Sequence, residues 1–146
     1  MDPQRHANLM EELNVLTGTE EAKQLMGIEI LRHLFLNHPN FMKLYNSKRW
    51  STLPQALNST YLGQLGIKYM DSVLELVRNY NDEEVLDQSI IRLANVHKHR
   101  GITVAHFIAV VPIFTDTLVS FFKNEENKES MQEILSKVLP KIGTRL

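Results

Sequence analysis

The stretch LANVHKHRGITVAHF, residues 93–107, contains the most informative helical pattern of the chain. One helical face leads into this stretch at spacings of four, three and four residues, and it is made of Leu86, Ile90, Leu93 and His97. The face is aliphatic except for the histidine at its end. Gly101 then ends the helix, and Thr103 is a suitable N-cap for the next one. The sequence therefore predicts a helix, a short corner and a second helix, with His97 facing inward.

Apolar residues recur at three- and four-residue spacing along nearly the whole chain, and no segment alternates with period two. We therefore expect an all-α protein of about seven helices. The expected helices run from Pro3 to about Leu16, from Glu20 to His38, from Pro39 onward as a short helix, from Thr60 to Tyr80, from Asp82 to Gly101, from Thr103 to Phe121 and from Met131 to Ile142. Two irregular segments are expected between them, a connection at 46–58 with a single short turn of helix and a polar hinge at 123–130.

Length and composition predict one domain, residues 1–146. The chain is 43% hydrophobic and 23% charged, and it contains no cysteine, which excludes disulfides, thiolate nucleophiles and the usual zinc-finger ligand sets. The formal charge of −1, without a basic run, argues against a nucleic-acid partner. We find no signal peptide, lipidation motif or uncharged membrane span, and so expect a cytoplasmic protein without membrane attachment.

Histidines are the strong transition-metal ligands that this chain offers, and it has six of them. No HExxH or similar paired motif is present, which argues against a zinc enzyme. His97 and His99 lie two residues apart, or about 200° around a helix, so they cannot both bind one ion. The pattern alone leaves two interpretations of His97, a core histidine bonded to a backbone carbonyl or a metal ligand.

Three segments together resemble the globin family. Residues 93–107 are similar to the proximal-histidine segment, GIEILRHLFLNHP at 27–39 resembles the second helix with its glycine and the proline that starts the third, and LGIKYM at 65–70 resembles the distal-helix motif. Their order and spacing agree, and together they cover most of the chain. The nearest resemblance is to intracellular invertebrate globins, including those of nematodes.

The resemblance implies a globin fold, with three helices packed over three around a haem b. It makes His97 the iron ligand, and Gly27 and Gly66 a close-packed pair where two helices cross. The implied cofactor-binding residues are Leu31, Tyr45, Leu65, Lys68, Tyr69, Leu93, His97, His99, Arg100, Ile102 and Phe107. Lys68, His99, Arg100 and His106 are the candidates for meeting the propionates, with His99 and Arg100 preferred.

The distal side departs from the family pattern. Leu65 stands where globins usually carry His or Gln, so the usual hydrogen-bond donor is missing. Tyr69, one turn further, is either a replacement donor or a bulky wall residue. Tyr45 replaces a phenylalanine that stacks on the haem, and its hydroxyl offers a second donor. A register slip of one residue would instead bring Gln64 inward.

The resemblance predicts a binding protein that takes up a diatomic gas (O2, and also CO or NO) reversibly at ferrous iron, in an unusually apolar distal pocket. Two alternatives remain. One is a haem redox protein, active in nitrite reduction, NO removal or a peroxidase-like reaction, or a gas or redox sensor. The other is an interaction module without haem. We expect a non-enzymatic protein that is a monomer or homodimer.

Overall fold

The computed structural model describes residues 1–45 and 50–146, which form helices joined by short connections, without a strand among them. The helices are α1 (Pro3–Leu16), α2 (Glu20–Asn37), the 3-10 helix η1 (Pro39–Tyr45), α3 (Leu53–Leu57), α4 (Thr60–Arg78), α5 (Glu83–His99), α6 (Val104–Ser120) and α7 (Glu125–Gly143). The predicted all-α class is confirmed. Of the predicted connection at 46–58, residues 46–49 lie outside the described residues, and α3 supplies the single short turn.

Most helices begin where the sequence places an N-cap. Thr19, Ser59, Asp82 and Thr103 each accept a backbone N–H of the following turn through a side-chain oxygen. Such caps satisfy donors that the first turn of a helix leaves unpaired. At the other end of α5, Gly101 adopts φ 82°, which a residue with a Cβ rarely adopts. These positions fix the corner between α5 and α6.

The predicted polar hinge at 123–130 is wrong, because α7 begins at Glu125 with Asn124 as its N-cap. Two polar residues of this segment, Asn127 and Ser130, are buried in the helix and form hydrogen bonds with α1. Asn127 is only 5% exposed, and its Nδ2 donates to Glu12 Oε1 at 2.8 Å. Part of this polar run therefore belongs to the buried contact between α7 and α1.

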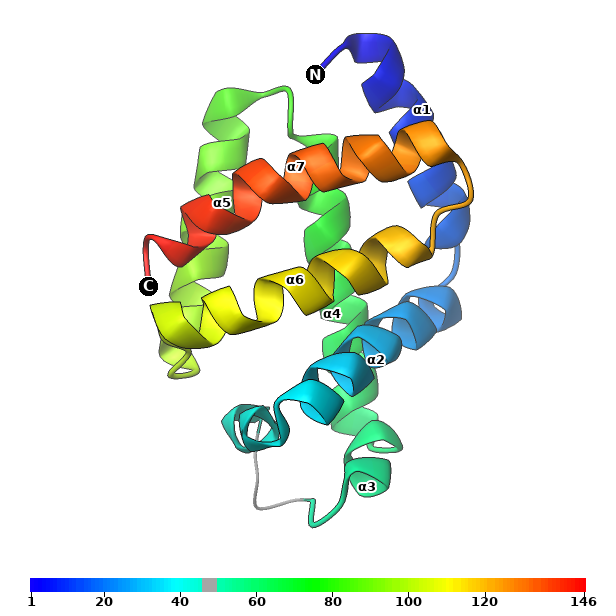
Figure 1. Cartoon of the computed structure of the whole chain (residues 1–146). Helices are drawn as coiled ribbons and strands as arrows, with labels where there is room; N and C mark the ends of the chain where they lie inside the picture. Colours follow the sequence, from blue (N-terminus) through cyan, green and yellow to red (C-terminus); the bar gives the residue numbers. More distant parts are fainter. Residues whose placement is uncertain (46–49) are drawn as a thin grey trace.

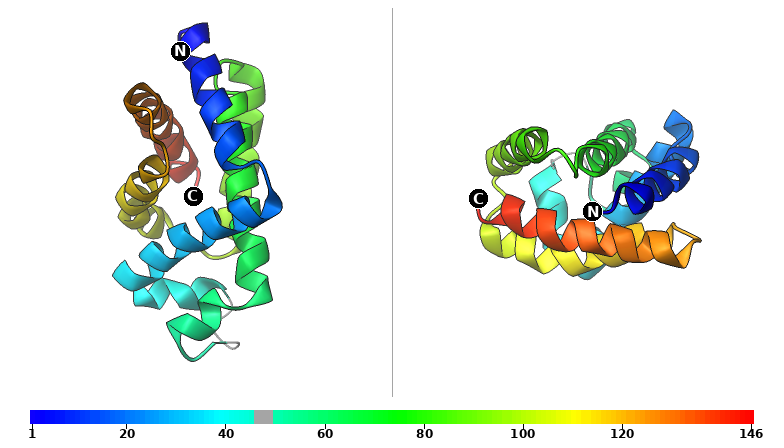
Figure 2. Two further views of the ribbon diagram at one scale, coloured as in Figure 1. Left: turned by 90° about the vertical axis from the view of Figure 1, so that its right-hand side faces the viewer. Right: turned by 90° about the horizontal axis from the view of Figure 1, so that it is seen from above.

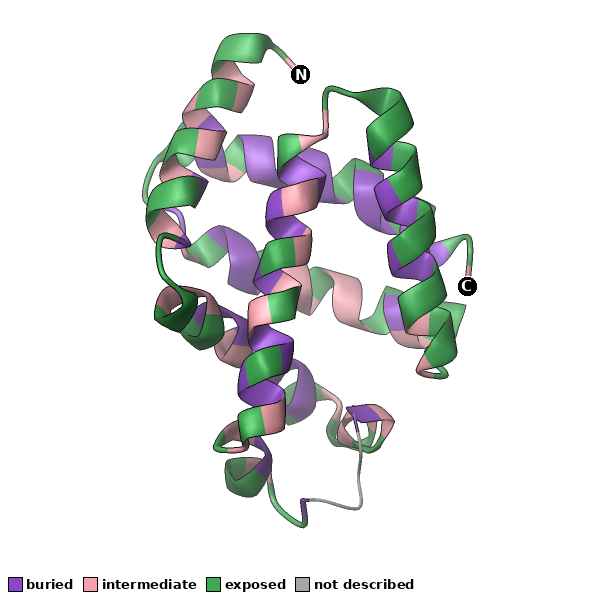
Figure 3. Ribbon diagram, turned by 180° about the vertical axis from the view of Figure 1, so that it is seen from behind, coloured by how far each residue is buried: buried purple, intermediate pink, exposed green. Residues whose placement is uncertain are grey.

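Two layers of helices form the body of the molecule (Figure 1). Helices α6 and α7 lie in front of α1, α4 and α5, as the view from above in Figure 2 shows, and α2 crosses in front of α4 (Figure 1). The buried residues face the space between the layers (Figure 3). In the described part of the chain no single helix is long and apolar enough to cross a membrane, although α5 and α6, bent by 116°, reach that threshold when counted together.

The closest approach between the layers is the crossing of α2 and α4 at Gly27 and Gly66. A Cβ built on Gly27 would overlap the backbone of Gly66, and one on Gly66 would lie 3.2 Å from the backbone of Gly27. Lys23 and Asp71 add an ion pair of 2.7 Å across the same two helices. The expected glycine pair is therefore present, and it lets the two backbones touch.

We expect Gly27→Ala to destabilise the protein by about 3 kcal/mol, because the added methyl group meets backbone and forces the helices apart. Gly63→Ala, on α4, is the matched control. Its Cβ would meet only the flexible Gln24 side chain at 2.9 Å, so it should be neutral or stabilising by up to about 1 kcal/mol. Urea unfolding of both variants tests this, and equal effects would contradict the role of the crossing.

Candidate functional site

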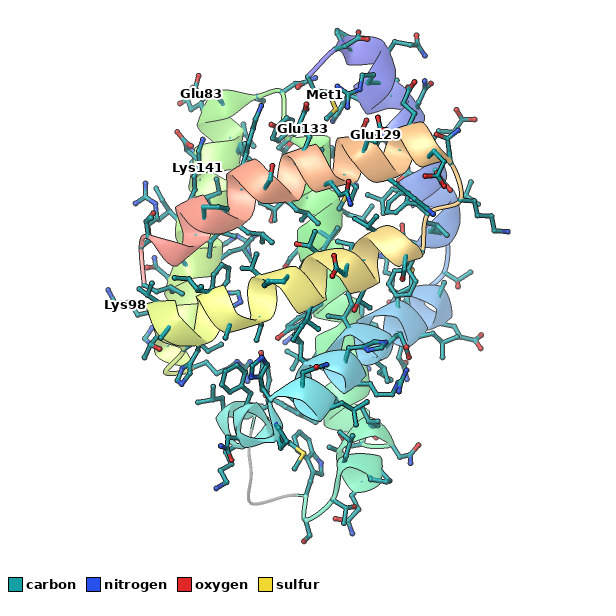
Figure 4. All side chains as sticks on the ribbon, viewed as in Figure 1. Met1, Glu83, Lys98, Glu129, Glu133 and Lys141 are labelled. Carbon is teal, nitrogen blue, oxygen red and sulfur yellow. The ribbon has the colours of Figure 1, made fainter. Side chains whose placement is uncertain are left out.

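A cavity of about 300 Å³ lies between the two layers, with walls from α2, η1, α4, α5, α6 and α7. Most of its lining side chains are apolar. The titratable groups on its wall are Tyr45, Tyr61, Lys68, Tyr69, His97, Arg100 and His106. Charged residues such as Glu83, Lys98 and Lys141 point outward from the surrounding helices (Figure 4). The interior between α4 and α5 is thus an apolar chamber with a few placed polar groups, which is typical of a ligand site.

His97 stands on the cavity wall in the last turn of α5. Its Nδ1 lies 2.7 Å from the backbone carbonyl oxygen of Leu93, one turn earlier. Since a carbonyl only accepts, Nδ1 must carry the proton, and the neutral ring then has its lone pair on Nε2. Burial lowers the pKa of His97, which favours this neutral form. Phe107 holds the ring edge-on, with the two ring centres 5.6 Å apart.

The structure combines both interpretations that the pattern left open for His97. The histidine does bond a backbone carbonyl, as a core histidine would. That bond uses only one ring nitrogen and leaves the other as a potential ligand.

Nine of the eleven residues implied as cofactor-binding line this one cavity. They are Tyr45, Leu65, Lys68, Tyr69, Leu93, His97, Arg100, Ile102 and Phe107. Leu65 is 8% exposed and lines the wall, as the Gly66 anchor predicts. Gln64, the alternative, is exposed and also borders the cavity, so it lies at the mouth.

Two of the eleven residues do not line the cavity. Leu31 is fully buried in the core, one turn before Leu34 and Phe35 of α2, which do line the cavity. His99, the last residue of α5, is exposed, because two residues beyond His97 the helix turns the side chain to the opposite side. His106, named with His99 as a propionate candidate, does border the cavity.

A pair of phenols forms the main polar feature of the wall opposite α5. The hydroxyl oxygens of Tyr45, on η1, and Tyr69, on α4, are 2.5 Å apart. Burial raises the pKa of Tyr45, and its hydrogen bond with Tyr69 partly offsets this. The pKa of Tyr69 is raised well above its ordinary value of 10.0, chiefly by burial and then by Tyr45. Both phenols are therefore neutral in the physiological pH range.

Arg100 links the corner after α5 to these phenols. Its guanidinium carbon lies 4.8 Å from the centre of the Tyr45 ring, a cation–π contact. Its Nη1 donates to the Tyr61 hydroxyl at 3.2 Å. No carboxylate lines the described part of the cavity wall. The cavity therefore has a basic rim with no acidic group on its wall.

The sequence reasoning missed much of the far wall. Phe41 and Leu44 of η1, Tyr61 of α4, Val110 and Phe114 of α6, and Leu135, Leu139 and Ile142 of α7 also line the cavity. Several of them belong to predicted apolar stripes, which reveal that a residue faces inward. An apolar helix face does not reveal whether one of its residues packs against another side chain or lines a cavity, because the packing depends on how the helices cross.

The buried phenols make stability depend on pH at the alkaline end. An unfolded tyrosine loses its proton near pH 10, while the folded phenols keep theirs, so the folded state binds more protons and stability falls as pH rises above about 10. We expect Tyr69→Phe to reduce this loss by up to about 1.4 kcal/mol per pH unit. Urea unfolding near pH 9 and near pH 11 measures it, each variant being compared with its own value at pH 7. Identical slopes in both proteins would contradict the prediction.

Comparison with known proteins agrees with this architecture. The sequence profile of the Globin family matches residues 28–142, which include Gly66, the whole described cavity wall and His97. A protein named Globin from Isoparorchis hypselobagri is 28% identical over 145 residues, covering 95% of this chain and 94% of that protein. The family match covers more than half of the chain, and it accounts for both the fold and the cavity that contains His97. This chain belongs to the globin family.

Proposed function

We propose that this protein holds a haem b through His97 and reversibly binds a diatomic gas, O2 and also CO or NO, at the ferrous iron. One observation carries the proposal. The Leu93 carbonyl fixes the proton on Nδ1 of His97, which leaves Nε2 as a neutral donor atom at the wall of an apolar cavity.

The residues present fit a haem. Its flat apolar ring needs two walls, and α4 supplies one with Leu65, Tyr69 and Val73 while α5 supplies the other with Leu93 and His97. Its two propionates are anions and need basic partners. Lys68, Arg100 and His106 border the cavity and can provide them. Of these, Lys68 is exposed and stands at the mouth.

When bound, a haem would supply an iron that takes up small gases as a reversible ligand. The chain's own residues position and shield it. Ile102 and Phe107, 8% and 7% exposed, exclude water beside His97. Leu31 is fully buried outside the cavity lining, and Tyr45 lines the cavity. His99 does not line the cavity, so the propionates would meet Arg100, Lys68 and His106.

Reconstitution with haem tests the assignment of His97. We expect the wild-type protein to take up one haem per chain and to give a five-coordinate ferrous spectrum that converts to stable O2 and CO forms. His97→Ala should lose most of the haem uptake. Among the described residues of α5, His97 is the one histidine that lines the cavity, and the variant removes its Nε2. His99→Ala is the matched control and should retain the uptake.

Three other results of the reconstitution would each contradict one part of the proposal. No haem uptake by the wild-type protein would leave the interaction module. A six-coordinate ferrous spectrum without added gas would reveal an internal ligand and favour the sensor or redox alternative. Rapid oxidation without a stable O2 form would favour the redox alternative as well.

A further inference from the structure

A polar groove lies on the surface of the molecule, where the start of α7 runs beside α1 (Figure 1). We propose that this groove binds a linear polyamine, a flexible chain of ammonium groups separated by methylene segments, of which spermidine is the model compound. The α1–α7 groove has a volume of about 550 Å³, and it shares no lining residue with the cavity that contains His97. The inference therefore goes beyond the proposed function and does not depend on it.

The polar side chains that line the α1–α7 groove are carboxylates and amides. They are Glu11, Glu12, Glu126, Asn8, Asn124 and Asn127. None of the described residues that line the groove is basic. Three carboxylates without a cation among them favour a ligand that has several positive charges.

Glu12 is held in place by hydrogen bonds from the start of α7. Its Oε1 accepts from Nδ2 of Asn127 at 2.8 Å, and its Oε2 accepts from the backbone N–H of Lys123 at 2.8 Å. Burial acts to raise the pKa of Glu12, but the hydrogen bonds outweigh it and the pKa lies below the ordinary value of 4.5. The carboxylate therefore keeps its negative charge in the physiological pH range.

Asn127 adds a hydrogen-bond acceptor without a partner. The side chain is 5% exposed, and its Nδ2 donates to Glu12 Oε1 at 2.8 Å and to the backbone carbonyl oxygen of Asn8 at 3.3 Å. These two bonds determine which end of the amide is the nitrogen. Oδ1 then has no hydrogen-bond partner among the described residues. A buried acceptor in this state costs free energy, and an N–H donor bound in the groove removes that cost.

The acidic groups are spread along the groove instead of surrounding one point. In the described part of the chain, no three carboxylate or histidine side chains are arranged to hold a metal ion. On α1 the lining extends from Asn8 to Val15, which is about 10 Å along the helix axis. A metal ion needs its ligands around a single centre, whereas a chain of ammonium groups can reach separate carboxylates one after another.

Spermidine fits this arrangement in charge, length and polarity. It has three ammonium groups, one for each carboxylate, and spans about 11 Å when it is extended. Its N–H groups can donate both to the carboxylates and to Oδ1 of Asn127. Its methylene segments are apolar, and Val15, which is 77% exposed, lines the groove beside the acidic residues.

Calorimetric titration of the full-length chain with spermidine at low ionic strength tests the proposal, and it needs no haem. We expect one spermidine per chain, bound roughly 1.5- to 5-fold more weakly by Glu126→Gln and by Glu11→Gln. Lys123→Gln should strengthen binding, because the charge of Lys123 acts on Glu12 and competes with the ligand. Glu84→Gln is the matched control. Glu84 is also an exposed glutamate in the first turn of a helix, it lies outside the groove, and its loss should leave the affinity unchanged.

Asn127→Ala tests the unpartnered acceptor, and it should weaken spermidine binding as well. This variant also loses two hydrogen bonds to α1, so it can fail to fold. NMR spectroscopy of the wild-type protein then gives the answer. Spermidine should shift the side-chain amide signals of Asn127 and the backbone signals of residues 8–15 and 124–127, and it should leave the signal of His97 in place.

Two compounds of the same charge test the identity of the ligand. Hexaamminecobalt(III) is a compact trivalent cation, and trilysine is a peptide with a net charge of three. Tighter binding of either compound than of spermidine would overturn the assignment to a linear polyamine. Equal weakening by Glu84→Gln and Glu126→Gln would reveal attraction to net charge alone and overturn the site. Haem uptake does not enter any of these results, so the proposed function stands or fails separately.

Discussion

The contact of two backbones at Gly27 and Gly66 is the constraint on which the rest of the structure depends. Helices with side chains at their crossing stay 8–10 Å apart in typical proteins, and glycine removes the side chains that keep them there. With α2 seated against α4 at this point, the rotation of α4 about its own axis is fixed. Leu65 and Tyr69 then face the space in front of α5, and the position of Gly66 leaves no room for another register.

Much of the fold follows from local interactions, such as helix N-caps, that can be recognised in the sequence alone. Thr19, Ser59 and Thr103 cap helices because their hydroxyl oxygens accept N–H groups of the next turn, and this needs no knowledge of the tertiary structure. The start of α7 was misjudged for the opposite reason. Asn127 is polar and yet buried, because its partner Glu12 lies far away in the sequence on α1. Long-range partners of this kind leave no periodic signal.

In the candidate site, too, some features can be predicted from the sequence and others depend on long-range contacts. The family resemblance predicted which residues face the cavity, and nine of the eleven do. What they do to one another could not be predicted, because the bond between Tyr45 and Tyr69 joins η1 to α4 across a connection whose path no pattern specifies. A pocket that looked apolar in sequence, with Leu65 in place of a donor, contains two neutral phenols and a guanidinium. Leu65 carries no polar group, but other residues of the same wall do.

The bond from His97 to the Leu93 carbonyl has a consequence for the entropy of binding. Its acceptor belongs to the same helix, one turn away, so α5 itself locks the imidazole rotamer as soon as the helix forms. Freezing a side chain at an interface costs about 0.5–1.5 kcal/mol when binding has to do it. Here folding has already done so, and the edge-on contact with Phe107 holds the ring plane as well. The donor nitrogen is thus preorganised, and binding needs no rearrangement of this residue.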